Sequence, residues 1–160
     1  MPHLKAGGTP ALHLRIRRAT VADIPTLMAL EKQATTAAHW SSEQYQTIFS
    51  GEAPPRVALV VEERAGVHGF IIGRALDDEW EIENLAVAGS ARLRGLGTRL
   101  VGGFLDLARA GAHSVFLEVR ESNQAARRLY EKCAFVEVGR RQRYYLEPAE
   151  DAIMYRLEFQ

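Results

Sequence analysis

The sequence is poor in cysteine, in long apolar runs and in net charge. Its one cysteine, Cys133, cannot form an internal disulfide, which fits a protein of a reducing compartment. No apolar run approaches the roughly 18 residues that a membrane-spanning helix needs. Twenty basic residues balance 20 acidic ones, so no overall field draws the chain to nucleic acid or to an anionic membrane. We therefore expect a cytoplasmic protein without a nucleic-acid or membrane partner.

Metal ligands are also scarce. The five histidines show no spacing such as H-x-x-x-H, and one cysteine adds little, so we expect no metal site. The 160 residues suffice for one domain with a buried core. Residues 1–12, which contain two glycines and two prolines, predict a flexible leader, and residues 13–160 predict a single domain.

The first third of the chain predicts one strand and two helices. Apolar and basic residues alternate over residues 14–18, which is typical of a strand. Asp23 and Pro25 predict the start of a helix, and its apolar stripe consists of Leu27, Leu30 and Ala34. Ser41 and Gln44 have the spacing of a capping box and predict a second helix that runs to about residue 49.

The rest of the chain predicts a mixed α/β fold. Two apolar runs joined by a short turn indicate an antiparallel hairpin. A third strand follows, and then a long helix that Gly111 should end. After these come a further strand, a helix capped by Ser122 and two last strands. The predicted strands cover residues 56–62, 67–76, 79–87, 114–119, 135–141 and 152–159. The long helix covers residues 97–110. Because residues 79–119 form a strand-helix-strand unit, its two strands should be parallel and joined by a right-handed crossover.

A basic turn with two glycines follows the strand that ends at residues 85–87. Main-chain N–H groups in a first helical turn converge on one point, and the helix dipole adds positive charge there. Arg92 and Arg94 would add full charges, while Gly95 and Gly97 would let a phosphate approach. Neither G-x-G-x-x-G nor the P-loop pattern is complete, so spacing alone leaves a pyrophosphate site and an ordinary helix start equally open.

Three polar side chains form a second constellation. Glu118 stands at the end of a predicted strand, and Asn123 and Tyr130 follow on the next helix, where seven residues bring them onto one face. A carboxylate, a carboxamide and a phenol can move protons during acyl transfer to an amine. Each also has a plainer interpretation, as a solvated strand end, a helix cap and a core residue, respectively.

These motifs occur in order and at the intervals of the GNAT superfamily of N-acetyltransferases, which the chain resembles over nearly everything after residue 14. They are Leu85-Ala86-Val87, Arg92-x-x-Gly95-x-Gly97, Leu117-Glu118-Val119-Arg120, Ser122-Asn123, Leu129-Tyr130 and Phe135. Within the superfamily the chain is most similar to the bacterial ribosomal-protein-alanine N-acetyltransferases, through Arg141-x-x-Tyr144-Tyr145 and Glu150-Asp151-Ala152-Ile153-x-Tyr155. The resemblance implies a mixed, mostly antiparallel sheet with a central parallel strand-helix-strand unit and flanking helices.

The resemblance also implies a reaction. An acetyl group would pass from acetyl-CoA to the N-terminal α-amino group of a protein, typically the alanine of a small-subunit ribosomal protein. Glu118 would be the general base, Tyr130 the general acid and Asn123 a contact of the coenzyme. The end of the strand would bind the pantetheine through Leu85, Ala86 and Val87. The turn would wrap the pyrophosphate through Arg92, Leu93, Arg94, Gly95, Leu96, Gly97 and Thr98.

Two questions stay open at this point. Glu81 and Glu83 alternate on the strand before the glycine turn, and either could be the base in place of Glu118. The acceptor could also be a lysine side chain or a small amine, and a domain that binds acetyl-CoA without turnover is a third alternative.

The chain departs from the family pattern at three places. Residues 88–91, before the glycine turn, lack the usual proline and glutamine, so the entry to the turn should differ and Arg92 should carry the polar role. Ala134 stands where the family has glycine, so it must adopt a costly left-handed conformation or the helix must end otherwise. Gln142 and Arg143 alter the usual pair before the two tyrosines, in what we expect to be a loop over residues 141–145. Since adjacent strand residues point to opposite faces, at most one of the two tyrosines should face the substrate.

Overall fold

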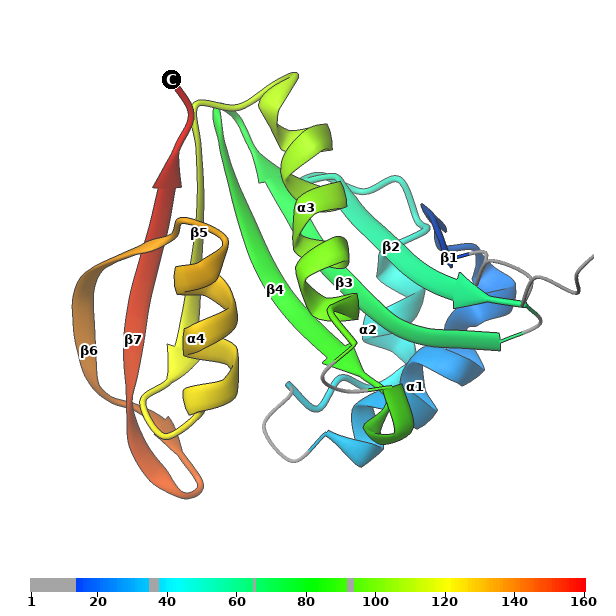
Figure 1. The fold of residues 1–160 in the computed structure, drawn as a ribbon, viewed down its shortest axis with the longest axis horizontal. Coiled ribbons are helices and arrows are strands. Elements are labelled where there is room, and N and C mark those ends of the chain that lie inside the picture. The colour runs from blue at the N-terminus through cyan, green and yellow to red at the C-terminus, as the bar shows by residue number, and fades with distance from the viewer. Residues whose placement is uncertain (1–13, 35–37, 65, 92–93) are drawn as a thin grey trace, which may run out of the picture.

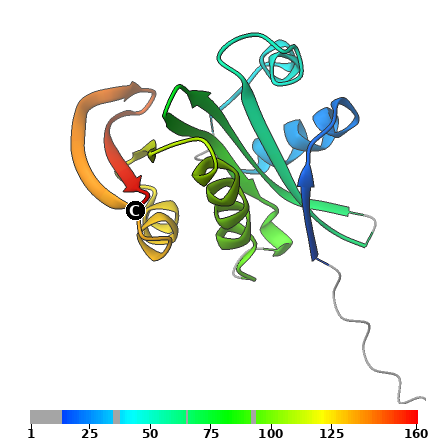
Figure 2. The ribbon, with the colours of Figure 1, turned by 90° about the horizontal axis from the view of Figure 1, so that it is seen from above.

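A computed structural model describes residues 14–34, 38–64, 66–91 and 94–160. The predicted leader and the residues Arg92 and Leu93 lie outside this part of the chain. The described residues form one seven-stranded sheet with helices on both faces (Figures 1 and 2). None of the described helices is both long enough and apolar enough to cross a membrane.

The strands follow the order β1-β2-β3-β4-β5-β7-β6 across the sheet. Among the described strands, β4 and β5 alone are paired in parallel, and the other pairings are antiparallel, as the resemblance implied. The strands are β1 (Leu14–Arg18), β2 (Arg56–Glu63), β3 (Gly66–Leu76), β4 (Glu79–Val87), β5 (Ser114–Arg120), β6 (Val136–Leu146) and β7 (Ala149–Glu158). The helices are α1 (Ile24–Gln33), α2 (Ser42–Thr47), α3 (Leu96–Arg109) and α4 (Gln124–Lys132), with short 3-10 turns at Val21–Asp23 and Gly89–Ala91.

Two cores lie on the two faces of the sheet. Helices α3 and α4 cover one face, and α1 and α2 cover the other (Figure 2). The predicted stripe of α3 is buried, because Leu100, Val101, Phe104, Leu105 and Ala108 recur at helical spacing and face the sheet. The long crossover helix therefore fixes β4 beside β5.

A fork opens between β4 and β5. Their parallel register covers only residues 79–82 of β4 and 114–117 of β5. On its other edge, β4 pairs with β3 and carries a bulge at Glu83. The neighbouring β3 residues Gly73 and Ile72 lie opposite Ile82 and Asn84, which leaves Glu83 without a partner in the register. Beyond this point the two strands diverge toward the lower edge of Figure 1. A bulge bends a strand, so this one aims the end of β4 away from β5.

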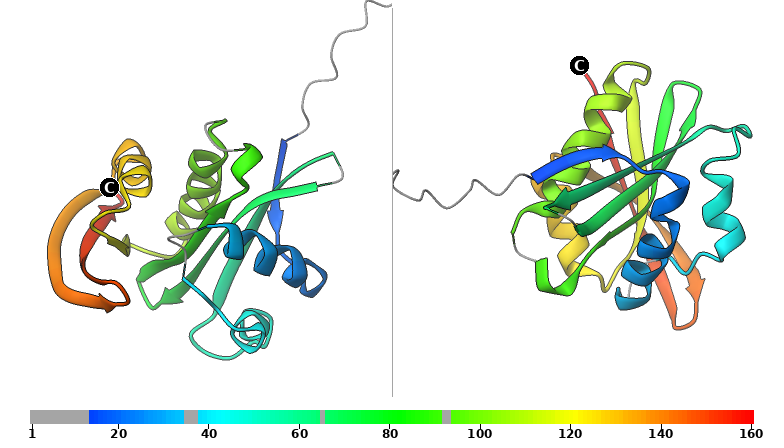
Figure 3. Two further views of the ribbon diagram at one scale, coloured as in Figure 1. Left: turned by 90° about the horizontal axis from the view of Figure 1, so that it is seen from below. Right: turned by 90° about the vertical axis from the view of Figure 1, so that its right-hand side faces the viewer.

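The C-terminal hairpin differs from the expectation of a loop. Residues 141–145 belong to β6, which forms with β7 a long curved hairpin at one end of the sheet (Figure 3). The register steps from Arg141 opposite Ala152 to Tyr145 opposite Glu150, so three residues of β6 face one of β7. Arg143 has a φ of 49° in this bulge, and its N–H donates to Asp151 Oδ1 at 2.9 Å.

Several helix ends differ from the predictions. The cap of α4 is Asn123 and not Ser122, because Asn123 Oδ1 accepts the N–H of Ala126 at 3.1 Å. Asp23 precedes α1, but its carboxylate accepts the Thr20 N–H at 2.7 Å instead of capping α1. Gly111 follows α3 without taking the left-handed conformation of a glycine stop.

Two other predictions about helix ends are confirmed. Ser41 and Gln44 form the expected capping box of α2. Ala134, after α4, has a φ of 72°, so the chain adopts the strained left-handed conformation without the glycine that relieves it.

Candidate functional site

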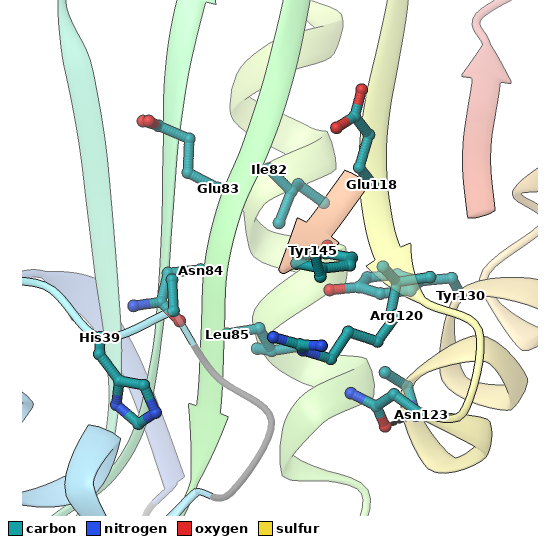
Figure 4. A pocket seen from close by; sticks show the side chains of 13 residues that line it. His39, Ile82, Glu83, Asn84, Leu85, Glu118, Arg120, Asn123, Tyr130 and Tyr145 are labelled. Carbon is teal, nitrogen blue, oxygen red and sulfur yellow. Dashed lines mark hydrogen bonds between the residues drawn. The ribbon is translucent and has the colours of Figure 1, made fainter. Parts of the chain in front are cut away.

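A cavity of about 350 Å³ lies in the fork between β4 and β5. The end of β4 forms one wall, and the end of β5 with α4 forms the other (Figure 4). Ala38 and His39, before α2, and Tyr145 on β6 close the sides. Glu118, Asn123 and Tyr130 all line this cavity, as do Leu85 and Glu83. The fold thus brings the predicted second constellation to one place.

Glu118 lies on β5, two residues before its end. The neighbouring side chains Leu117 and Val119 are buried in the core under α3 and α4. Because strand residues alternate, the Glu118 side chain points to the other face of the sheet. Its side chain is 16% exposed, and Oε1 lies 2.7 Å from Nε of Arg141 on β6. Glu118 is therefore a half-buried, paired carboxylate and not a solvated strand end.

Tyr130 projects from α4 into the cavity with its hydroxyl toward β4 (Figure 4). Its ring packs against those of Phe135, at a centroid distance of 5.6 Å, and Tyr155, at 6.4 Å. Burial raises the pKa of Tyr130, so the phenol stays protonated at neutral pH. Tyr130 is both a core residue and a cavity residue, and Asn123 likewise caps α4 and lines the cavity.

The β6 bulge gathers the two tyrosines beside Glu118. The rings of Tyr144 and Tyr145 meet edge to face, at a centroid distance of 5.1 Å, which simple strand alternation would not allow. Of the two, Tyr145 lines the cavity, while Tyr144 is 51% exposed. The nearby Glu118 carboxylate raises the pKa of Tyr144, and burial together with Glu118 raises the pKa of Tyr145 to about 12.

The two rival carboxylates on β4 are also paired. Glu83 lines the cavity and accepts from Nε of Arg56 at 3.0 Å. Glu81 accepts from Nε of Arg74 at 3.2 Å, and burial raises the pKa of Glu81. Glu81 is not a lining residue of the cavity, so of the three carboxylates only Glu118 and Glu83 line it.

The glycine turn leads directly into α3. Gly95 is the N-cap, with a φ of 76° that favours glycine. The first intrahelical bond runs from the Arg99 N–H to the Gly95 oxygen, at 3.1 Å. The N–H groups of Leu96, Gly97 and Thr98 thus have no partner within the helix, which is the requirement for an anion site.

Two residues of the turn have other contacts. A Cβ on Gly97 would lie 3.0 Å from Cδ2 of Leu129, so the packing of α3 on α4 already favours glycine there. Arg94 pairs with Glu63 of β2 at 2.8 Å. The predicted positive charge of Arg94 is therefore partly neutralised by a neighbouring strand.

Sequence patterns gave no role to a buried polar pair near the cavity. Glu31 of α1 is 3% exposed and Asn84 of β4 is 4% exposed. Glu31 Oε1 accepts the Trp40 N–H at 2.9 Å and the Asn84 side-chain amide at 3.1 Å. The sequence does contain an indication of this burial, because Glu31 falls on the apolar stripe of α1, between Leu27 and Ala34. This pair ties the segment beside His39 to β4.

Comparisons with known proteins agree with this geometry. The model of the acetyltransferase (GNAT) family matches residues 24–135. An uncharacterized protein of Mycobacterium leprae is 40% identical over 129 residues, which cover 70% of this chain but only 35% of that protein. The [ribosomal protein bS18]-alanine N-acetyltransferase of Salmonella typhimurium is 35% identical over 140 residues, which cover 84% of this chain and 90% of that enzyme.

A solved structure extends the similarity to the fold. The ribosomal-protein-S18-alanine N-acetyltransferase of Escherichia coli superposes with a TM-score of 0.80 at 28% identity, and the match covers 91% of this chain and 93% of that one. The family model spans well over half of the chain, and both the fork and the helix start that follows it lie inside the matched residues. The chain therefore belongs to the acetyltransferase (GNAT) family.

Proposed function

We propose that this chain is an acetyl-CoA-dependent N-acetyltransferase that acetylates the N-terminal alanine of a ribosomal protein. The observation that carries the proposal is the meeting of Glu118 and Tyr130, from β5 and α4, in one cavity of the fork. The relatives that carry such names act on ribosomal protein bS18. The free cysteine, Cys133, fits a cytoplasmic location.

The residues present fit acetyl-CoA. The β4–β5 register ends at Ile82 and Leu117, so the main chain of residues 85–87 faces the fork beyond the paired part of β5. The first turn of α3 offers the N–H groups of Leu96, Gly97 and Thr98 to a pyrophosphate. We propose that Leu85, Ala86 and Val87 bind the pantetheine and that residues 92–98 and Asn123 contact the coenzyme. When bound, acetyl-CoA supplies an acetyl thioester.

The acceptor must lose a proton before it can attack. An α-amino group has a pKa of about 7.7 to 8.0, so most copies are protonated at neutral pH. In the proposed mechanism, Glu118 takes this proton directly or through one water. Tyr130, which burial keeps protonated, gives its proton to the leaving thiolate. Main-chain N–H groups of residues 85–87 would stabilise the developing negative charge on the acetyl oxygen.

The acceptor is tested with a panel of short peptides that differ in the first residue, incubated with acetyl-CoA while thiol release is followed. We expect turnover with an alanine-first peptide and none with its N-terminally capped form. Turnover with capped, lysine-containing peptides or with polyamines would replace the proposed acceptor with a side chain or a small amine. Binding of acetyl-CoA without any turnover would indicate a non-catalytic domain.

The base is tested by three matched variants. Glu118→Gln should lower kcat by about 10²- to 10⁴-fold, because general-base catalysis contributes that much, and acetyl-CoA binding measured by calorimetry should persist. Glu83→Gln and Glu81→Gln control for the loss of a carboxylate on the neighbouring strand. An unchanged rate in Glu118→Gln with a collapse in Glu83→Gln would move the role of base to Glu83.

A further inference from the structure

We propose that Arg120 is a positioning residue that clamps the β6–β7 turn and the Tyr145 ring over the cavity, and thereby sets the affinity for the acceptor. The proposal rests on the proposed function in one respect, that the cavity binds an acceptor amine. Arg120 belongs to the same motif as Glu118, two residues further along β5, yet neither the proposed chemistry nor the coenzyme uses it.

The guanidinium of Arg120 reaches the main chain of the β6–β7 turn. One terminal nitrogen donates to the Pro148 oxygen at 3.1 Å, and the other donates to the Glu147 oxygen at 3.3 Å. The first of these nitrogens also lies 3.4 Å from Oε2 of Glu150, at the start of β7. The other oxygen of the Glu150 carboxylate accepts the N–H of Ser122. A single side chain of β5 thus binds both residues of the turn.

The central carbon of the same guanidinium, Cζ, lies over the Tyr145 ring, at 4.2 Å from the ring centroid. Tyr145 and Arg120 both line the cavity, where they lie next to each other between Glu118 and Asn123 (Figure 4). A planar group that donates along its edge and stacks on its face can do both at once, which an ammonium cannot. The clamp therefore needs arginine.

The turn needs such a clamp because the sheet holds it weakly. The bulge at residues 142–144 interrupts the β6–β7 ladder, and only Tyr145 with Glu150 and Leu146 with Ala149 pair beyond it. In the described part of the chain, β6 is also the last strand of the sheet, with β7 as its one neighbour. The Arg120 side chain is 21% exposed, so solvent screens its contacts less than those of a surface pair.

A second arginine provides a matched control on the same hairpin. Arg140 pairs with Glu121 and Asp151, both at 2.8 Å, but it lies before the bulge and its side chain is 40% exposed. Its ion-pair partners are Glu121, in the turn between β5 and α4, and Asp151 of β7, neither of which belongs to the turn at residues 147–148. Loss of Arg140 should therefore leave the turn in place.

The test combines steady-state kinetics with hydrogen exchange on Arg120→Ala, Arg120→Lys and Arg140→Gln. In both Arg120 variants we expect the acceptor KM to rise about tenfold, the equivalent of one charge-assisted hydrogen bond, with the acetyl-CoA KM within about twofold of its starting value. Amide exchange at residues 144–147 and 149 should accelerate by a similar factor. Arg140→Gln should match the unmodified protein in both measurements.

Three outcomes would overturn the clamp. Unchanged exchange with a raised acceptor KM would mean that Arg120 binds the acceptor directly. Faster exchange with an unchanged KM would mean that the turn does not serve the acceptor, and equal effects in Arg140→Gln would remove the special role of Arg120. If the unmodified protein does not acetylate the alanine peptide, the proposed function fails, and the kinetic arm is run with whichever amine the panel identifies.

Discussion

Arg141 Nε, on β6, lies 2.7 Å from Oε1 of Glu118, on β5. The guanidinium also stands over the ring of Tyr144, at 5.7 Å from its centroid. The carboxylate that would accept a proton from a protonated amine therefore already has a cation beside it. An acceptor that binds Glu118 must compete with this side chain.

We predict that Arg141→Gln strengthens the binding of a cationic acceptor. The Arg141 side chain is 54% exposed, and an exposed pair contributes about 0.2 to 1 kcal/mol, so the acceptor KM should fall by at most about fivefold. The measurement is the peptide KM at low and high salt. Arg143→Gln removes the same charge two residues further along β6, inside the bulge, and should have a smaller effect. A higher KM in Arg141→Gln would show that Arg141 helps to bind the acceptor.

We predict that Tyr130→Phe lowers kcat by about 10²-fold, the lower end of the contribution of a general acid. Burial raises the pKa of Tyr130, so its phenol stays protonated through pH 9, and the unmodified protein should show no alkaline loss of kcat below that pH from this group. Phe keeps the packing against Phe135 and Tyr155, so the melting temperature should change little. An unchanged kcat would remove Tyr130 from the chemistry.

Two glycines should respond in opposite directions to the same substitution. A Cβ on Gly73 of β3 would lie 2.3 Å from Cζ of Phe104 and 2.4 Å from the Glu81 oxygen, so Gly73→Ala should cost about 2 to 3 kcal/mol of the free energy of unfolding. Gly102, inside α3, has nothing within 4 Å of that position, so Gly102→Ala should add about 0.5 to 1 kcal/mol. Urea unfolding of both variants measures the difference.

The ion pair between Arg17 and Asp23 should make stability depend on acid pH. Hydrogen bonding to the Arg17 guanidinium lowers the pKa of Asp23. A terminal nitrogen of Arg17 lies 2.8 Å from Oδ2 of Asp23. A depressed folded-state pKa adds stability above the unfolded value of about 3.9 and loses it as the pH falls through the folded value. Asp23→Asn should therefore cost about 1.5 to 3 kcal/mol at pH 7, and the cost should shrink as the pH falls below about 4. A cost that is the same at every pH would contradict the assignment.

Local patterns predicted most of the fold. The stripe of α3, the capping box at Ser41 and the apolar runs of β2 to β5 depend on neighbours a few residues away, and all are present. The bulge at residues 142–144 was not predictable, because it depends on which β7 residues lie opposite β6. This bulge places Arg141 and the two tyrosines beside Glu118.

The site was predictable in its residues but less so in its contacts. Glu118, Asn123 and Tyr130 do meet in one cavity, as their spacing indicated. The partners of the ionised groups come from distant parts of the chain: Arg56 for Glu83, 27 residues away, and Asn84 for Glu31, 53 residues away. Such pairs follow from strand order and register, which local sequence patterns do not reveal.

The short parallel pairing of β4 and β5 has a mechanical consequence. Four residue pairs join these strands, against eight in each of the pairings β2–β3 and β3–β4. The sheet is thus two stiff blocks, β1 to β4 and β5 to β7, that meet along a narrow seam. Apart from the β6–β7 turn beyond the bulge, a small rotation of one block against the other strains fewer residue pairs than a separation of neighbouring strands within a block. A rotation about this seam would widen or narrow the gap where two reactants would meet, and the packing of α3 across β4 and β5 is what limits it.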